Sequence, residues 1–238
     1  MDYLLLKRFR ALFEGTTYLH RNSSLGDSVA QLLPEDLVAL GRSPRLAARV
    51  EQGISVLNTQ NKRRGIIARR GDGSFGEIIP GTVAIFDPGF RVGRGAVATI
   101  EVGAEVKILA KAMIKQIDRV KSDLLKQLDH FRRGGDAPVT VAIVGVNYAV
   151  KYCSFEGERS YPTNGRDHKH PVQEAKEAEA RILRDVAPLY DETLILRFRA
   201  TNEAPFPFEW VSENDTLLDY GAILARISRR YEDRFRNS

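Results

Sequence analysis

One stretch of the chain, residues 96–110, combines an alternating apolar pattern with charged side chains. Its even-numbered positions from 100 to 108 are all apolar, whereas Glu101, Glu105 and Lys107 stand at odd positions. Side chains alternate across a strand, so the pattern predicts a strand with one face in the core and the charged residues on the other. Buried charges are costly unless they pair or bind a cation. We therefore expect either a functional site or a structural Glu–Lys pair on this face.

Periodicity along the rest of the chain predicts helices alternating with strands. Apolar residues at helical spacing predict helices over residues 1–14, 24–40, 43–57, 112–133, 172–189 and 216–235, with Pro34 dividing the second. Strands are predicted over residues 65–70, 77–86, 96–110, 139–146 and 193–200. Residues 71–74 indicate a tight turn that contains Asp72, residues 154–171 a polar loop, and residues 202–210 an irregular segment with two prolines.

This order predicts an α/β fold with a mixed central β-sheet flanked by helices. The first three strands are expected to form an antiparallel meander. The strand at 139–146 follows a helical crossover, so we expect it to lie parallel to the strand at 96–110. We expect a single domain over residues 1–238, with a helical N-terminal part to residue 60, an αβ core over 61–200 and a C-terminal extension with a helix over 201–238.

Composition narrows the class of protein. Of the 238 residues, 43% are hydrophobic and 28% charged, which is typical of a globular domain. No apolar run approaches the roughly 20 residues that a membrane helix needs, and the first residues do not resemble a signal peptide. The single cysteine, Cys153, excludes an internal disulfide. These features predict a cytoplasmic protein without a membrane partner.

An acid at the end of one strand, Glu-x-Lys on the next strand and a long helix after it form a motif with a family resemblance. The matching residues are Asp87 and Glu105-Val106-Lys107, with Pro88 following the first acid instead of preceding it. This arrangement resembles the PD-(D/E)XK nuclease superfamily, which includes restriction endonucleases and RecB-like exonucleases. The resemblance implies a restriction-endonuclease-like core between N- and C-terminal helical extensions, and metal-dependent hydrolysis of phosphodiester bonds in DNA.

The resemblance also implies roles for these residues. Asp87 and Glu105, with the carbonyl of Val106, would hold Mg²⁺, for which Mn²⁺ can substitute; oxygen ligands suit both ions. Lys107 would orient the attacking water, stabilise the charged phosphate or act as a base, and the sequence leaves these roles open.

Further polar residues are candidates for an accessory role. Glu101 is either a second metal ligand or a partner that neutralises a cation. Glu51, on the helix before the core, and Glu77, before Asp87, are accessory acids that the resemblance suggests. Gln116 and Gln127 lie on the long helix, and the segment from Gln127 to Phe131 is similar to the Gln-x-x-x-Tyr motif of RecB-like nucleases with Phe in place of Tyr.

Basic residues cluster on both sides of the proposed acidic site. The net charge of the chain is +5, and its cationic candidates for binding the phosphate backbone are Lys62, Arg63, Arg64, Arg69, Arg70, Arg91, Arg94, Lys111, Lys115 and Arg119. DNA is the expected partner, and a restriction-type endonuclease is expected to act as a homodimer. Three alternatives stay open: a RecB-like exonuclease or repair nuclease, a non-catalytic nucleic-acid-binding protein, and an unrelated α/β enzyme acting on a small acidic molecule.

Overall fold

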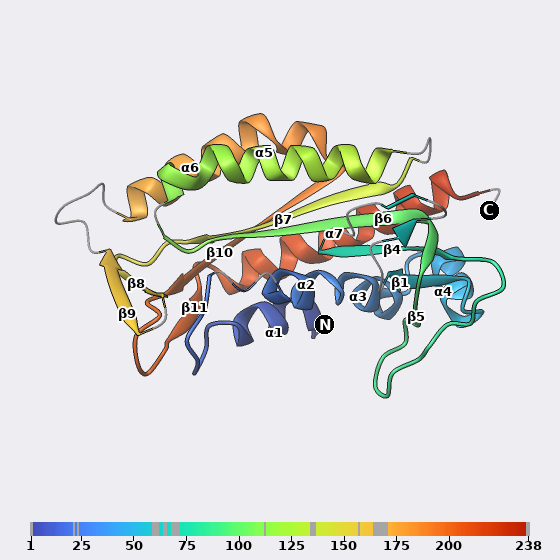
Figure 1. Cartoon of the computed structure of the whole chain (residues 1–238), viewed down its shortest axis with the longest axis horizontal. Coiled ribbons are helices and arrows are strands. Elements are labelled where there is room, and N and C mark those ends of the chain that lie inside the picture. Colours follow the sequence, from blue (N-terminus) through green and yellow to red (C-terminus); the bar gives the residue numbers. More distant parts are fainter. Residues whose placement is uncertain are drawn as a thin grey trace.

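Seven strands form one mixed sheet, and helices cover both of its faces (Figure 1). The computed structural model describes residues 2–20, 22, 24–58, 62–63, 66–67, 72–111, 113–133, 137–156, 158–163 and 171–236. The strand order is β11-β10-β7-β6-β4-β1-β5. These strands are β1 (Ser55–Asn58), β4 (Gly73–Ile78), β5 (Arg94–Gly95), β6 (Val97–Leu109), β7 (Val139–Asn147), β10 (Glu192–Ala200) and β11 (Phe208–Trp210). The predicted α/β fold with a mixed central sheet is confirmed.

The sheet contains an antiparallel meander and a helical crossover as predicted, but β1 takes the place of the predicted strand at 65–70 in the meander. β4 pairs antiparallel with β1 and with β6, and β6 pairs parallel with β7, which pairs parallel with β10. The predicted helix 43–57 is wrong at its end, because α4 (Pro44–Glu51) stops before Gly53 and the next residues form β1. Gly53 has a φ of +67°, a left-handed conformation that ends helices. β1 is thus the first strand of the meander.

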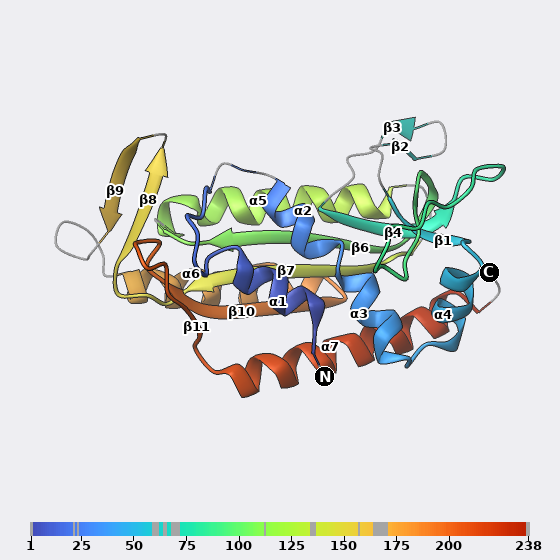
Figure 2. The same ribbon diagram turned by 90° about the horizontal axis from the view of Figure 1, so that it is seen from below.

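The helices form two layers. α5 (Met113–Arg132) and α6 (Pro171–Asp185) lie on one face of the sheet. The other face carries α1 (Leu4–Ala11), α2 (Ser24–Ala30), α3 (Leu33–Leu40) and α7 (Glu213–Arg234), as Figure 2 shows. Pro34 stands in the first turn of α3, so it divides the predicted 24–40 helix as expected. A short 3-10 helix (Ala187–Leu189) follows α6.

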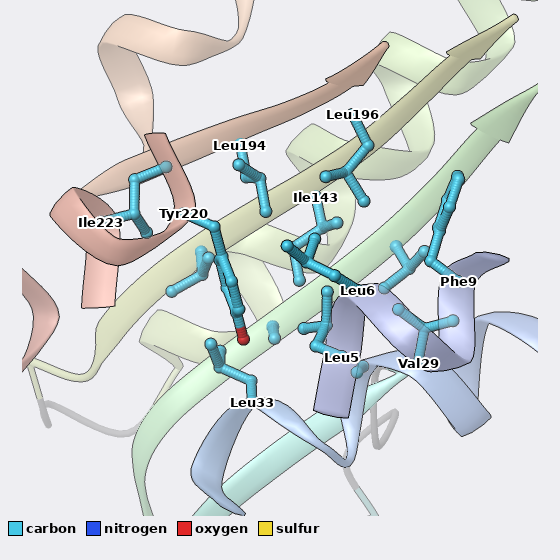
Figure 3. Close-up of a cluster of buried hydrophobic side chains, with 14 of the residues drawn as sticks. Leu5, Leu6, Phe9, Val29, Leu33, Ile143, Leu194, Leu196, Tyr220 and Ile223 are labelled. Carbon is cyan, nitrogen blue, oxygen red and sulfur yellow. The ribbon is translucent and has the colours of Figure 1, made fainter. Parts of the chain in front are cut away.

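The larger core lies between the sheet and the second layer of helices (Figure 3). Leu5 and Phe9 of α1 and Tyr220 of α7 are fully buried against apolar residues of β7 and β10. Gly145 of β7 leaves room for the ring of Phe9, since a Cβ at position 145 would lie 2.6 Å from that ring. Each such large apolar side chain contributes roughly 1.5–3 kcal/mol by burial. This packing fixes the sheet that carries the charged residues.

A bulge in β6 interrupts its alternation of faces. Phe75 of β4 pairs with Val102 and Gly76 pairs with Ile100, so Glu101 is an extra residue without a partner in β4. Ile100 packs in a cluster with Phe131 of α5, whereas Val102 packs in the core of α1 and α7. The expectation that all odd positions share one face is therefore wrong. The side chain of Glu101 points toward α7, where it accepts a hydrogen bond from the hydroxyl of Tyr231.

Three local predictions differ from the structure. The strand predicted over residues 77–86 ends with β4 at Ile78, and residues 79–93 are a loop joined to β5 by one bridge between Ile85 and Arg94. Val83 and Ile85 of this loop are 86% and 67% exposed. A strand needs a neighbour to cover its apolar face, and this segment has little cover. The polar region 154–171 holds an antiparallel hairpin of β8 (Tyr152–Glu156) and β9 (Arg159–Thr163). Within the predicted 65–70 strand, β3 (Ile66–Ile67) pairs with β2 (Lys62–Arg63).

Among the helices that the structure describes, none is long and apolar enough to span a lipid bilayer.

Candidate active site at the start of β4

Asp72 and Glu105 meet where β4 begins beside β6. The backbone N–H of Asp72 donates to Oε2 of Glu105 over 3.2 Å. The backbone N–H of Val106 donates to Oδ2 of Asp72 over 2.8 Å. Two carboxylates are thereby held by reciprocal backbone hydrogen bonds between adjacent strands.

The carbonyl of Val106 lies on the same side of β6 as this pair. In an antiparallel pair a residue exchanges both its N–H and its C=O with one neighbour, so the two groups share a direction. Because the Val106 N–H reaches Asp72, its C=O also points to that side of the strand. The site thus offers two carboxylates and one carbonyl, which are oxygen donors of the kind that Mg²⁺ prefers.

Burial and mutual repulsion shape the charges of this site. Burial, with the nearby charge of Glu105, raises the pKa of Asp72 to about 7, although Lys107 and the Val106 N–H act in the opposite direction. Two carboxylates this close resist being ionised together unless a cation joins them. The local field at Asp72 therefore favours binding of a cation.

Lys107 supplies one positive charge to the pair. Its ammonium forms an ion pair with Oε1 of Glu105. Burial lowers the pKa of Lys107, but the charges of Glu105 and Asp72 raise it by more, so the net shift is upward. Lys107 is therefore an ammonium at neutral pH in the metal-free protein.

A cavity of about 230 Å³ opens beside this site. Asp72, Val106 and Lys107 line it from the sheet, and Gln116 and Arg119 line it from α5. The remaining lining residues are Tyr18, His20, Asn22, Gly26, Ile108, Ala110, Lys111, Val120 and Asp123. The N-terminal segment thus contributes one wall, although it lies far from the other residues in sequence.

Two glycines allow this close packing around Asp72. A Cβ on Gly26 of α2 would lie 2.9 Å from Oδ2 of Asp72, and one on Gly73 would lie 2.8 Å from the Cβ of Ala30. Either added methyl group would require a neighbour to move. Glycine at these positions lets α2 pass directly over the carboxylate.

The structure brings Glu105, Val106 and Lys107 together, but it does not bring Asp87 to them. Asp87 lies on the exposed loop after β4, where its Oδ2 pairs with Nε of Arg94 over 2.7 Å. Asp87 is not among the residues that line the cavity at Asp72, and its partner Arg94 belongs to β5, which β1 separates from β4 in the sheet. Assigning Asp87 to the site followed from extending the strand through residue 86. The acid beside Glu105 is Asp72, which the sequence presented as a turn residue.

Glu101 belongs to a buried ion-pair network on the opposite face. Its Oε1 accepts from Arg49 over 2.6 Å, and its Oε2 accepts from Ser55 over 2.8 Å and from Tyr231 over 2.6 Å. Of the two roles left open for Glu101, the structure supports the neutralising partner.

The other accessory candidates separate into those in the cavity and those outside it. Gln116 lines the cavity next to Lys107. Glu51 is exposed at the last turn of α4, and Glu77 accepts from Thr99 over 3.5 Å. Gln127 is buried on α5, and within the described part of the chain its Nε2 has no hydrogen-bond partner. These three residues are not among those that line the cavity.

The basic residues predicted to bind the phosphate backbone also include some that line the cavity and some that do not. Lys111 and Arg119 line the cavity, whereas Lys115 is an exposed residue of α5. Arg91 lies on the loop with Asp87, whereas Arg94 belongs to β5 and lies over the ring of Phe90. Arg64, Arg69 and Arg70 lie outside the described residues, and of Lys62 and Arg63 only the backbone of β2 is described.

Asp72 was not predicted as a site residue from the sequence, nor was the wall formed by Tyr18, His20, Asn22 and Gly26. The segment after Asp72, Gly73-Ser-Phe-Gly-Glu-Ile78, does not alternate between apolar and polar residues, so no strand pattern marks Asp72 as the residue before a strand. No local signal identifies Tyr18 or His20, because only tertiary packing brings the N-terminal segment to β6.

Within the described ranges, no group of three or more His, Cys, Asp or Glu side chains converges in the manner of a side-chain metal cage. The site has two carboxylates and a carbonyl, and Mg²⁺ often binds proteins through one or two carboxylates while keeping waters. No family model, curated protein or solved structure matches this chain.

Proposed function

We propose that this protein is a metal-dependent nuclease that hydrolyses phosphodiester bonds in DNA, with Asp72, Glu105 and Lys107 as its catalytic residues. The observation that carries the proposal is the contact of Asp72 with Glu105 across adjacent strands, with Lys107 paired to Glu105. An acid on one strand beside Glu-x-Lys on the next strand resembles the arrangement of the PD-(D/E)XK superfamily.

The strand order supports this proposal beyond the three residues. β1, β4 and β6 form an antiparallel meander, α5 crosses over, and β7 returns parallel to β6. α4 precedes the meander, as the restriction-endonuclease-like core would require. Asp72 takes the place that the sequence pattern alone had given to Asp87, and Gly71 stands where the pattern name has proline.

Asp72, Glu105 and the Val106 carbonyl would hold Mg²⁺ or Mn²⁺. The raised pKa of Asp72 supports this fit, because a divalent cation would relieve the repulsion between its carboxylate and that of Glu105. When bound, such an ion lowers the pKa of a coordinated water and offsets charge on the phosphate.

Lys107 acts as the charge-stabilising group. Its raised pKa keeps it an ammonium, which favours stabilisation of the phosphate or orientation of water over service as a base. Gln116 and Arg119 line the same cavity and are placed to contact the phosphate or sugar. Arg119 and Lys111 add positive charge where a phosphate backbone would enter.

Cleavage of supercoiled plasmid and of linear DNA, with Mg²⁺, Mn²⁺ or EDTA, tests the proposal. We expect the wild type to cut in the presence of metal, and Asp72→Asn, Glu105→Gln and Lys107→Ala to lose activity while circular dichroism shows an intact fold. Asp87→Asn is the matched control and should stay active.

The outcomes separate the alternatives. Discrete fragments from plasmid support the restriction-type endonuclease, and degradation of linear DNA alone supports the RecB-like exonuclease. Binding of DNA without cleavage on plasmid and on genomic DNA would refute the catalytic proposal and favour a binding protein. The homodimer stays a prediction that sedimentation at assay concentrations tests.

A further inference from the structure

The β8–β9 hairpin forms an arm beside the end of β6 and the start of α5 (Figures 1 and 2). Its base is fixed, since Tyr152 and Cys153 are buried and the N–H of Cys153 donates to the carbonyl of Thr201 over 2.9 Å. The side chain of Asn202 donates to the carbonyl of Cys153 over 2.8 Å. β9, in contrast, is exposed along nearly its whole length. The arm is thus firmly attached and open to a ligand.

Lys111 links this arm to the cavity at Asp72. It lines the cavity, its Nζ donates to Oγ of Ser154 on β8, and it lies 5.5 Å from the centre of the Tyr161 ring on β9. Ser154 and Tyr161 face one another across the hairpin, and Oγ of Ser154 also donates to the carbonyl of Tyr161 over 3.4 Å. One lysine therefore touches both the site and the arm.

Tyr161 presents an aromatic ring to solvent at this place. The residue is 42% exposed although a cation lies over its ring. An exposed ring beside a lysine is the combination by which proteins hold single-stranded nucleic acid: the ring stacks on a base and the cation attracts the backbone. Bases inside a duplex have both faces covered by neighbours, so they cannot stack in this way without being extruded.

We infer that Tyr161 stacks on the base of a nucleotide next to the cleaved phosphate, and that the preferred substrate is DNA unpaired at the cleavage position. The inference rests on the proposed nuclease function and adds its substrate class. The phosphate of that nucleotide lies in the cavity at Lys107 and Lys111, and its base reaches the ring, because the Lys111 ammonium that lines the cavity is 5.5 Å from the ring centre. Lys111 is a positioning residue that holds the arm and its ring at the site.

Two measurements test the inference separately from the nuclease activity. In the first, fluorescence titration without Mg²⁺ compares short single-stranded, fully paired and bubble-containing DNA that carries 2-aminopurine. We expect Tyr161→Ala to bind single-stranded DNA about 5- to 150-fold more weakly and to lose the quenching of 2-aminopurine that stacking causes. Tyr161→Phe should keep both.

Phe90→Ala is the matched control, because Phe90 is 38% exposed and carries Arg94 over its ring at 5.2 Å, on the loop that holds Asp87. Its removal should leave affinity and quenching unchanged. Lys111→Gln should weaken binding and reduce quenching, since the arm loses its link to the site.

In the second measurement, cleavage rates are compared on single-stranded, bubble and paired DNA with Mg²⁺. We expect cleavage at unpaired positions to exceed that of paired DNA, and Tyr161→Ala to reduce this preference through KM. Equal affinity and quenching for wild type and Tyr161→Ala would overturn the stacking inference, even if the wild type cuts. A wild type that binds and quenches but cuts nothing would refute the nuclease proposal alone.

Discussion

Glu101 and Glu105 stand four residues apart on one strand, but substitutions at the two positions should affect different properties. A change at Glu101 should lower the stability of the fold, and a change at Glu105 should abolish cleavage. Glu101→Gln leaves the Arg49 guanidinium without its anion in a buried site, since the two side chains are only 11% and 3% exposed. Removing one partner of a buried ion pair costs about 3–5 kcal/mol. In a chain of this size that corresponds to a fall of roughly 6–20 °C in Tm.

Thermal unfolding followed by circular dichroism measures the effect. Glu14→Gln is the control, because Glu14 pairs with Arg10 at the surface with 47% and 43% of the side chains exposed, and such pairs contribute about 0.5 kcal/mol or less. Tyr231→Phe removes one hydrogen bond to Glu101 and should cost about 1.5–3 kcal/mol.

A DNA cleavage assay distinguishes the structural role of Glu101 from the catalytic role proposed for Glu105. Below its Tm, Glu101→Gln should cut DNA as the wild type does, because Glu101 lies on the α7 side of the sheet. Glu105→Gln should lose activity, and its Tm should fall less than that of Glu101→Gln, because the side chain of its partner Lys107 is 24% exposed and Asp72 remains as a nearby anion. A Glu101→Gln variant that unfolds at the wild-type Tm, or that is inactive while fully folded, would contradict the structural role of Glu101.

Three further predictions follow from the contacts around β4 and β6. Because the pKa of Asp72 is raised to about 7, the folded protein binds a proton that the unfolded chain has released, so in EDTA the wild type should lose stability as pH rises from about 4 to about 7. Asp72→Asn should lack this loss and should be more stable than the wild type at pH 8 by on the order of 4 kcal/mol in urea unfolding. Mg²⁺ should reduce this difference, and a difference in stability that does not change between pH 4 and pH 8 would contradict the raised pKa. Asp72→Asn should reduce cleavage to background and Asp87→Asn should not, and the reverse result would return Asp87 to the site. Gly103→Ala places a Cβ 2.6 Å from the Phe131 ring and should lower the free energy of unfolding in urea by about 1–3 kcal/mol. The Gly103→Ala, Phe131→Leu double variant should recover part of this stability. Unchanged stability of the single variant would show that the ring moves freely.

Elements with a local pattern could be predicted from the sequence alone. The stripe of α5 and the apolar run of β7 predicted a helix and a buried strand at nearly their observed bounds, because side-chain periodicity follows directly from helix and strand geometry. The pairing of Glu105 with Lys107 was also local, since residues two apart on a strand share a face. The α/β class and the parallel return of β7 followed from the order of the elements.

The acid that lies beside Glu105 could not be predicted from local patterns, because it depends on how the strands pack. Asp87 follows the apolar residues 83–86, and Asp72 directly precedes β4. Which of the two acids lies beside Glu105 depends on where β4 begins and ends along β6. The register also contains the bulge that turns Glu101 to the opposite face. Strand pairing is set by contacts between residues far apart in the chain, so no local period encodes it. The contribution of Tyr18 and His20 to the cavity could not be predicted for the same reason, because their segment reaches the cavity only when α1 and α2 pack on the sheet.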